Sequence, residues 1–266
     1  MSEYRYKRFT TSLLFRDLRF PGAAAAPGDR FPSFDLVTTN GDRLVNSDVF
    51  GDKPVLFIFG SMTCPMTASS APSVQKLHDE FGDRVDFVML YVREAHPGEN
   101  YAQAETIEDK IESARALQEF YGINWTVATD NVDGDLHRAL DPKPNAAYLA
   151  NSDGEILFRS LWAADYGALR QALDDAAAGR AMTRTQSNKL LGPVIRAMGV
   201  VREVMERGGP QAVSDLWRAG FPMALAGQVA TLFKPLGPDQ RGMAAVITLA
   251  LGLLVILILL ARYIFP

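Results

Sequence analysis

Two apolar segments mark the buried strands of this chain, the first continuous and the second interrupted only by Asp86. Residues 54–59 (PVLFIF) form the first run and residues 85–92 (VDFVMLYV) the second. Runs of this length between polar or turn residues are typical of strands buried on both faces of a sheet. Residues 63–81 lie between them and repeat their apolar positions at helical spacing. Strand, helix and strand in this order predict a βαβ unit with parallel strands.

A second round of the pattern follows, with a helix predicted over residues 106–120 and a short strand over residues 126–129. Glycine turns mark two hairpins. The remaining predicted elements are a hairpin at residues 34–39 and 43–45, a hairpin at residues 146–150 and 156–161, and a closing helix at residues 166–178. Together they predict an α/β, thioredoxin-like domain over residues 30–179.

Different segments flank this domain. Residues 1–29 are predicted to be an N-terminal arm that ends in a flexible joint (AAAAPG), and they contain no apolar run of signal-peptide length, so we expect the chain to start in the cytoplasm. Residues 243–261 contain neither charge nor proline. A helix of this length is roughly 28 Å long, close to the hydrocarbon thickness of a bilayer. We therefore predict one transmembrane helix at residues 243–264.

Residues 180–242 are predicted to form a basic, amphipathic helical connector, with one helix over residues 189–206 and a break at residues 208–210. From residue 181 to residue 242 there are eight Lys or Arg and four Asp or Glu. The positive-inside tendency then places the domain at residues 30–179 in the cytoplasm, with a single-pass anchor at the C-terminal side. An alternative interpretation puts part of the connector on the membrane interface, through Leu190, Val194, Met198 and Phe221.

Composition restricts the chemistry. The balance of 27 basic and 31 acidic residues gives no reason to expect a nucleic-acid partner. The single cysteine, Cys64, excludes an intramolecular disulfide, so a redox cycle needs an external thiol reductant such as glutathione or a thioredoxin-like protein. Three scattered histidines do not supply the ligands of a metal site, and we expect neither a metal nor a cofactor.

Cys64 follows the first buried strand and starts the predicted helix, with Pro65 at the first helical position. Helix amide groups and the helix dipole lower the pKa of cysteines in this position, so the sequence predicts a reactive thiolate. We therefore assign Cys64 as the nucleophile.

The loop after the second strand emerges at the same edge of the sheet. In this loop we predict that His96 moves a proton at the substrate, that Glu94 orients the imidazole, and that Arg93 offers positive charge to the thiolate. His78 and His137 are predicted to be surface residues.

The motif GSMTCP at residues 60–65, followed by the strand and then REAHP at residues 93–97, resembles the active-site sequence of the iodothyronine deiodinases, with Cys64 at the selenocysteine position. This resemblance implies a thioredoxin fold and reductive chemistry at Cys64, with Ser61, Thr63 and Pro65 supporting the thiolate or positioning substrate. A more distant resemblance links the opening FPSFDL and Ser61 to the peroxiredoxins.

These observations predict a membrane-anchored, one-cysteine thiol oxidoreductase that reduces a halogenated or peroxide substrate. Two alternatives stay open. One is a peroxiredoxin-like peroxide reductase, and the other is a non-catalytic, membrane-tethered binding module with a thioredoxin fold. Attack on iodine and attack on peroxide oxygen need the same thiolate and the same proton donor, so the sequence does not separate them.

Overall fold

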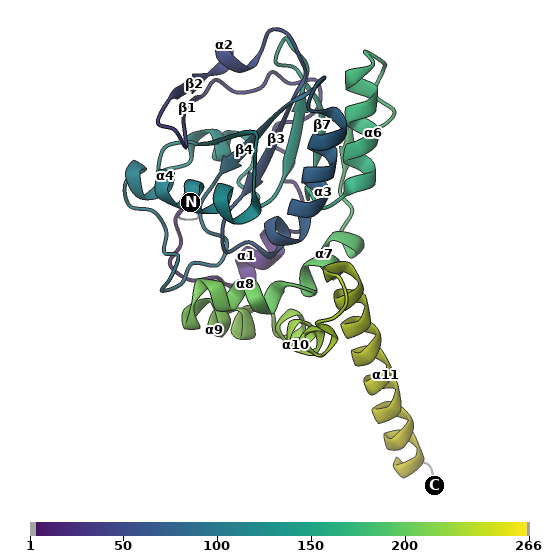
Figure 1. Cartoon of the computed structure of the whole chain (residues 1–266). Coiled ribbons are helices and arrows are strands. Elements are labelled where there is room, and N and C mark those ends of the chain that lie inside the picture. The colour runs from purple at the N-terminus through teal and green to yellow at the C-terminus, as the bar shows by residue number, and fades with distance from the viewer. Residues whose placement is uncertain (1–3, 265–266) are drawn as a thin grey trace.

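The structure is a computed structural model that describes residues 4–264, so the first three residues of the predicted arm lie outside the described part. Its main body is a mixed sheet with helices packed on it, and α11 projects away from this body (Figure 1). The strand order is β2-β1-β5-β4-β3-β6-β7-β8. The strands are β1 (Asp35–Thr38), β2 (Arg43–Val45), β3 (Val55–Gly60), β4 (Asp86–Tyr91), β5 (Thr126–Thr129), β6 (Ala147–Ala150), β7 (Ile156–Ser160) and β8 (Gln186–Ser187).

The two apolar runs form the centre of the sheet. β3 is buried over its whole length and pairs in parallel with β4, with Val55 opposite Asp86 and Gly60 opposite Tyr91. β6 pairs with the other side of β3 in antiparallel orientation. The thioredoxin-like fold predicted from the sequence is confirmed by this arrangement. β8, which pairs in parallel with β7, was not expected from its two-residue pattern.

Alternating side chains of the central strands divide the core into two apolar clusters. One cluster joins β3 and β4 to α3 (Pro65–Phe81), α4 (Ile107–Tyr121) and α6 (Tyr166–Ala177). The other joins the opposite faces of these strands to α5 (Asp135–Leu140) and to the segment before β1. Because successive strand residues point to opposite faces, one sheet organises both clusters. Two short helices, α1 (Thr11–Arg16) and α2 (Asn46–Val49), complete the domain.

The connector is a group of short helices under the domain, and the one helix predicted over residues 189–206 is divided into two. That prediction is wrong because the helix ends at Gly199, where α7 crosses the start of α11: a Cβ at Gly199 would lie 2.0 Å from the Pro238 carbonyl oxygen. The helices are α7 (Leu191–Met198), α8 (Val201–Gly208), α9 (Pro210–Ala219), α10 (Phe221–Ala230) and the 3-10 turn η1 (Thr231–Phe233).

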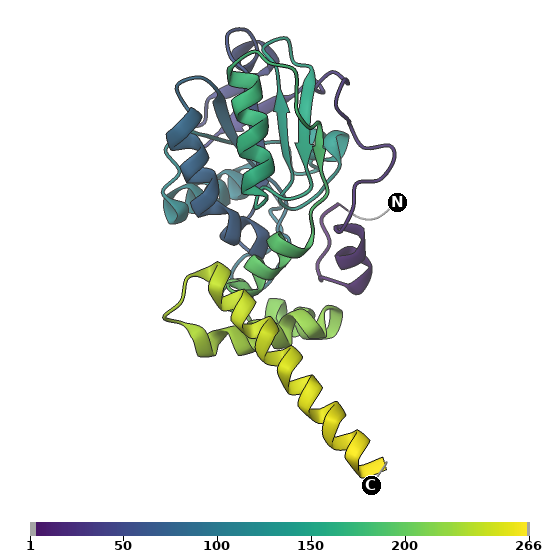
Figure 2. The same ribbon diagram turned by 90° about the vertical axis from the view of Figure 1, so that its right-hand side faces the viewer.

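The last element, α11 (Pro238–Ile264), starts beside α7 and α10 and then extends alone (Figure 2). It has 27 residues with a mean hydropathy of 3.0 in its most apolar window, and 6% of that window is buried. α11 is therefore long and apolar enough to cross a membrane, and its side chains are exposed as an anchor requires.

Candidate active site

The structure places Cys64 directly before α3. Its backbone is extended (φ −96°, ψ 114°), and its Sγ accepts a hydrogen bond from the backbone N–H of Thr67 at 3.4 Å. Pro65 occupies the first helical position, where an N–H would have no helical partner. β3 and α3 together therefore hold the sulfur at a helix N-terminus on the C-terminal edge of the sheet.

The predicted low pKa of Cys64 is not what the structure shows. Cys64 is 1% exposed, and burial raises the pKa of its thiol to about 11 although the Thr67 N–H favours the thiolate. Desolvation disfavours the charged form more strongly here than one helix amide favours it. Its apolar surroundings come from four parts of the chain, including Met66, Ala95, Trp162 and Ala197. In this closed arrangement the sulfur is held as a thiol.

Hydrogen bonds join the Cys64 loop to the loop after β4. Ser61 Oγ accepts from the backbone N–H of Ala95 at 3.3 Å, and Thr63 Oγ1 accepts from the backbone N–H of His96 at 3.0 Å. Ser61 and Thr63 are fully buried. These two hydroxyl groups therefore connect the two loops and hold the backbone of His96 next to the turn that precedes Cys64.

Glu94 is directed at Thr63 and not at the imidazole, which corrects the predicted role. Its carboxylate accepts from the backbone N–H of Thr63 at 2.8 Å and from the hydroxyls of Thr63 and Tyr91. Burial raises the pKa of Glu94, and the hydrogen bonds from Thr63 and Tyr91 oppose this shift. The Thr63 hydroxyl donates to Glu94 while it accepts from His96, so Glu94 positions the histidine loop through Thr63.

His96 lies under the ring of Phe9, with the ring centroids 4.1 Å apart. Its side chain is buried, and burial lowers the pKa of the imidazole to about 3. Within residues 4–264, Nδ1 has no hydrogen-bond partner. While it is buried, this imidazole stays neutral at neutral pH, and one of its two ring nitrogens carries no proton. The closed site therefore contains a neutral thiol and a neutral base.

The pKa of His96 predicts a pH dependence of stability. Between about pH 3 and about pH 6.5 the unfolded chain binds a proton at this residue, whereas the folded chain does not. Acid therefore destabilises the fold. The contribution of neutral His96 to the free energy of unfolding is complete above about pH 6.5. On going from pH 7 to pH 5 the free energy of unfolding should fall in both chains. We expect the fall to be about 2 kcal/mol smaller in His96→Asn than in the parent chain. Urea unfolding of the full chain in detergent micelles at both pH values measures this difference, and equal losses would contradict it.

Arg93 does not serve Cys64 in this structure, contrary to the prediction. Its Nη2 donates to the Pro142 carbonyl oxygen at 3.0 Å, and its guanidinium lies over the rings of Tyr4 and Tyr6, 4.9 and 5.2 Å from their centroids. Cation–π contacts of this kind hold the N-terminal arm on the sheet edge. Arg93 therefore holds the N-terminal arm in place and does not contact Cys64.

The other two histidines are not free surface residues. His137 is fully buried, with Nε2 2.7 Å from the Lys143 carbonyl oxygen and Nδ1 2.9 Å from the Tyr4 hydroxyl. His78 is half-buried and stacks on Trp125 at 4.6 Å. The prediction for His137 is wrong, because helical spacing does not show which distant rings and carbonyl oxygens pack on a helix. No group of three His, Cys, Asp or Glu in the described chain could hold a metal ion.

Two segments that are distant in sequence cover the site. From the arm, the Tyr6 hydroxyl donates to the Ala95 carbonyl oxygen at 2.8 Å. From the connector, Arg207 donates to the Met62 carbonyl oxygen at 3.3 Å, and a Cβ at Gly208 would lie 3.3 Å from the His96 carbonyl oxygen. The sequence shows no periodicity that relates these residues to Cys64.

The arm and the connector are also joined to each other. Arg8 Nε donates to Asp215 Oδ1 at 2.9 Å, and the Phe9 backbone N–H donates to Asp215 Oδ2 at 3.1 Å. The Asp215 side chain is 3% exposed, whereas that of Arg8 is 48% exposed. This carboxylate therefore connects the segment that carries Phe9 to α9.

Removal of Arg8 should loosen this cover. We expect Arg8→Ala to increase the rate of Cys64 alkylation by iodoacetamide about threefold to tenfold, because breaking one charged pair shifts an opening equilibrium by that order. The matched control is Arg43→Ala, which removes another Arg–Asp pair, to Asp35 at 2.8 Å, on exposed strands. Equal alkylation rates in the parent and both variants would show that the pair does not hold the cover closed.

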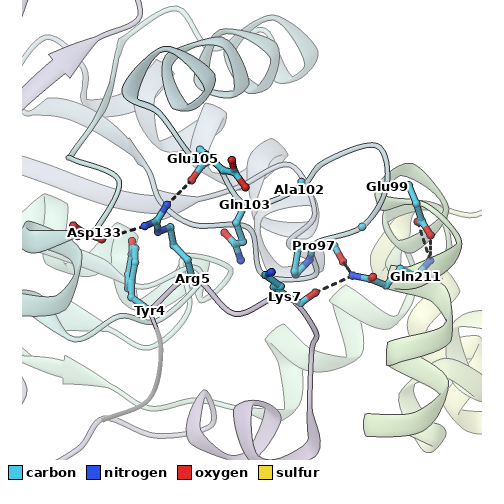
Figure 3. Close-up of a pocket in the computed structure, with 12 residues that line it drawn as sticks. Tyr4, Arg5, Lys7, Pro97, Glu99, Ala102, Gln103, Glu105, Asp133 and Gln211 are labelled. Atoms are coloured by element: carbon cyan, nitrogen blue, oxygen red, sulfur yellow. Dashed lines mark hydrogen bonds and ion pairs between the residues drawn. The ribbon is translucent and has the colours of Figure 1, made fainter.

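A polar cavity of about 640 Å³ opens beside this loop, between the arm, the segment 97–105 and α9 (Figure 3). Gln211 lies between the two walls, donating to the carbonyl oxygens of Lys7 and Pro97. Arg5 is directed at Asp133, 3.5 Å away. The lining includes both positively and negatively charged side chains. One lining residue, Pro97, directly follows His96 in the sequence.

A comparison with protein families shows the family of this chain. The family model described as iodothyronine deiodinase matches residues 14–159, more than half of the 266 residues. The chain belongs to the iodothyronine deiodinase family. The sequence motifs around Cys64 and His96 lie inside the matched region, so the predicted family is confirmed.

Individual relatives agree with the family. The chain is 27% identical over 104 residues to the type II iodothyronine deiodinase of Fundulus heteroclitus, covering 35% of this chain and 39% of that protein. It is 31% identical over 106 residues to the human thyroxine 5-deiodinase, covering 36% and 35%. The chain thus matches little more than a third of the length of these relatives.

A solved structure shares the fold. An uncharacterized conserved protein from Geobacillus kaustophilus superposes with a TM-score of 0.50 at 20% identity, covering 64% of this chain and 88% of that one.

Proposed function

We propose that this deiodinase-family protein performs reductive dehalogenation, with Cys64 as the nucleophile and His96 as the group that moves the proton. The observation that supports this most directly is the pair of hydrogen bonds from the 95–96 backbone to Ser61 and Thr63, which brings the only nucleophilic sulfur and a neutral imidazole to one edge of the sheet. Neutral His96 takes the thiol proton when the cover opens, and the sulfur becomes a thiolate.

The proposed reaction has three steps, of which the first reduces the carbon–iodine bond. The thiolate attacks iodine, the S–I bond forms, and the C–I bond breaks with its electron pair on carbon, which receives the proton from His96. An external thiol then attacks the sulfur, releases iodide and forms a mixed disulfide. A second thiol resolves this disulfide and regenerates Cys64, so two thiols are oxidised for each carbon–iodine bond that is reduced.

The reductant must come from outside the chain because Cys64 is its only cysteine. Glutathione or a thioredoxin-like protein fits this role. The cavity beside Pro97, lined by Arg5, Lys7 and Glu105, suits the approach of a small thiol that carries both positive and negative groups. The basic excess of residues 181–242 supports a cytoplasmic position of this domain, where such thiols are reduced.

The test uses the full chain in phospholipid vesicles with a thiol reductant. Release of iodide from an iodinated phenol, faster than consumption of hydrogen peroxide, supports dehalogenation. Faster consumption of peroxide assigns the protein to the peroxide reductases, in which the thiolate attacks oxygen and forms a sulfenic acid.

The burial of Cys64 favours a second candidate, a membrane-tethered binding module without turnover. A thiol with a pKa of about 11 is almost fully protonated at neutral pH. Alkylation of Cys64 in the parent chain no faster than that of a free thiol, together with no turnover of either substrate, would support this candidate.

A further inference from the structure

We propose that residues 210–237, comprising α9, α10, η1 and the turn before α11, lie on the lipid interface and form a second membrane contact beside the anchor. We call this segment the platform. Its occupant is the surface of the phospholipid bilayer into which α11 inserts.

The position of the platform along α11 supports this inference. The uncharged apolar run of α11 starts at Met243. Gly242 and Ala245, on either side of that start, are buried, and a Cβ at Gly242 would lie 1.9 Å from the Ile195 carbonyl oxygen of α7. α10 also packs against α11. The connector therefore meets α11 at the point where its lipid-facing surface starts.

The platform exposes apolar side chains at this level. Phe221 is 57% exposed, Leu232 is 74% exposed and Leu236 is 39% exposed. The ring of Trp217 lies 5.7 Å from that of Phe221. Aromatic rings beside long apolar side chains are typical of the boundary between headgroups and acyl chains.

Basic residues accompany these side chains. Arg218 and Lys234 are exposed and, among residues 4–264, form no ion pair with a carboxylate. Arg241, just beyond the platform, pairs with Glu203 at 2.8 Å. Lys and Arg beside interfacial aromatic residues match the negative charge of lipid phosphates. The surface therefore has the composition of a lipid contact.

The alternative predicted from the sequence named a different set of residues. Leu190, Val194 and Met198 are partly buried, and Leu190 packs on the cluster around Cys64. Of the four residues in that interpretation, Phe221 is the one exposed on the platform.

Attachment to the bilayer through both α11 and the platform would fix the orientation of the thioredoxin-like domain, whereas attachment through α11 alone would leave it free to rotate. In Figure 1 the start of α3, which carries Cys64, lies next to α8 on the side of the domain that faces α9 and α10. A platform on the lipid interface therefore turns the edge of the sheet that holds Cys64 toward the bilayer.

Spin labels can test the position of the platform in the full chain reconstituted in phosphatidylcholine vesicles with phosphatidylserine. Cys64→Ser removes the only native cysteine, and nitroxides are then attached to Phe221→Cys and Leu232→Cys. Asp83→Cys, in the turn at the opposite end of α3, is the aqueous reference, and Leu254→Cys is the reference in the span.

We expect the ratio of oxygen to nickel-chelate accessibility at positions 221 and 232 to exceed that at position 83 at least about threefold, because oxygen partitions into lipid and the chelate into water. Ratios equal to that at position 83 would overturn the proposal. Spin–spin broadening at positions 221 and 232 that disappears on dilution with unlabelled chain would also overturn it, because it would show a second copy on this surface.

A second measurement needs no cysteine variants. Trp217 fluorescence in the native chain should be quenched by lipids brominated near the headgroup end of their chains, and most of the quenching should be absent from Trp217→Phe. Equal quenching in both chains would contradict contact between Trp217 and lipid.

Discussion

Serine in place of Cys64 is expected to reduce substrate reduction by about 10³-fold or more, because a hydroxyl at this position has no base strong enough to form the alkoxide. The substitution changes one buried atom at the start of α3, and the Thr67 N–H can still donate to the new oxygen. The fold should therefore persist. The measurement is initial rate of iodide release by the full chain in vesicles.

The control for this variant is Ser73→Cys in the Cys64→Ser background, which restores a thiol on the same helix but away from its N-terminus. We expect no recovery of activity. Unchanged activity in Cys64→Ser, with circular dichroism equal to that of the parent, would show that the sulfur takes no part in the reaction.

Alanine in place of His96 is expected to lower kcat by about 10²-fold, the lower end of what a positioned proton-transfer group contributes. The loss should fall on the step that oxidises Cys64, because neutral His96 accepts the thiol proton in the proposed reaction. Stopped-flow oxidation of Cys64 measures this step separately from its reduction by external thiol.

His78→Ala is the matched control, since His78 is also packed against an aromatic ring but lies in the last turn of α3, at the opposite end from Cys64. Its rate should stay within about twofold of the parent rate. Equal rates for His96→Ala and the parent would remove His96 from the mechanism and leave Cys64 as the only assigned catalytic residue.

Both predictions require the site to open. Cys64 and His96 are 1% and 7% exposed, so substrate cannot reach either side chain while Phe9 and the connector lie over them. Opening hydrates the sulfur and so removes the desolvation that raises the pKa of Cys64. The helix amide, which lowers this pKa, then favours the thiolate. The cover therefore controls both access and reactivity.

Much of the fold was predictable because the apolar patterns in the sequence correspond to the strands and helices of the structure. Residues 54–59 are apolar throughout and residues 85–92 are apolar except for Asp86, and β3 and β4 are the two central strands that such segments indicate. The predicted closing helix at residues 166–178 and α6 differ by one residue at the end. Hydrophobic periodicity is a local property, so it predicts elements that pack with their own regular face.

The roles of the site residues depended on contacts that no local pattern contains. Glu94 contacts Thr63, 31 positions earlier, rather than the imidazole two residues later. Arg93 faces Tyr4 and Tyr6 of the arm. A side chain on a loop chooses among all partners that the fold brings near, and sequence spacing gives no distance to partners from other elements.

The sequence by itself determined the family, the thioredoxin-like order of elements, the single cysteine at a helix start and one apolar helix of membrane-spanning length. Only the tertiary structure decided that the cysteine is covered and its pKa raised. The Arg8–Asp215 pair joins residues 207 positions apart across the site. Burial depends on such long-range packing, and desolvation follows burial, so the state of Cys64 is a property of the folded chain.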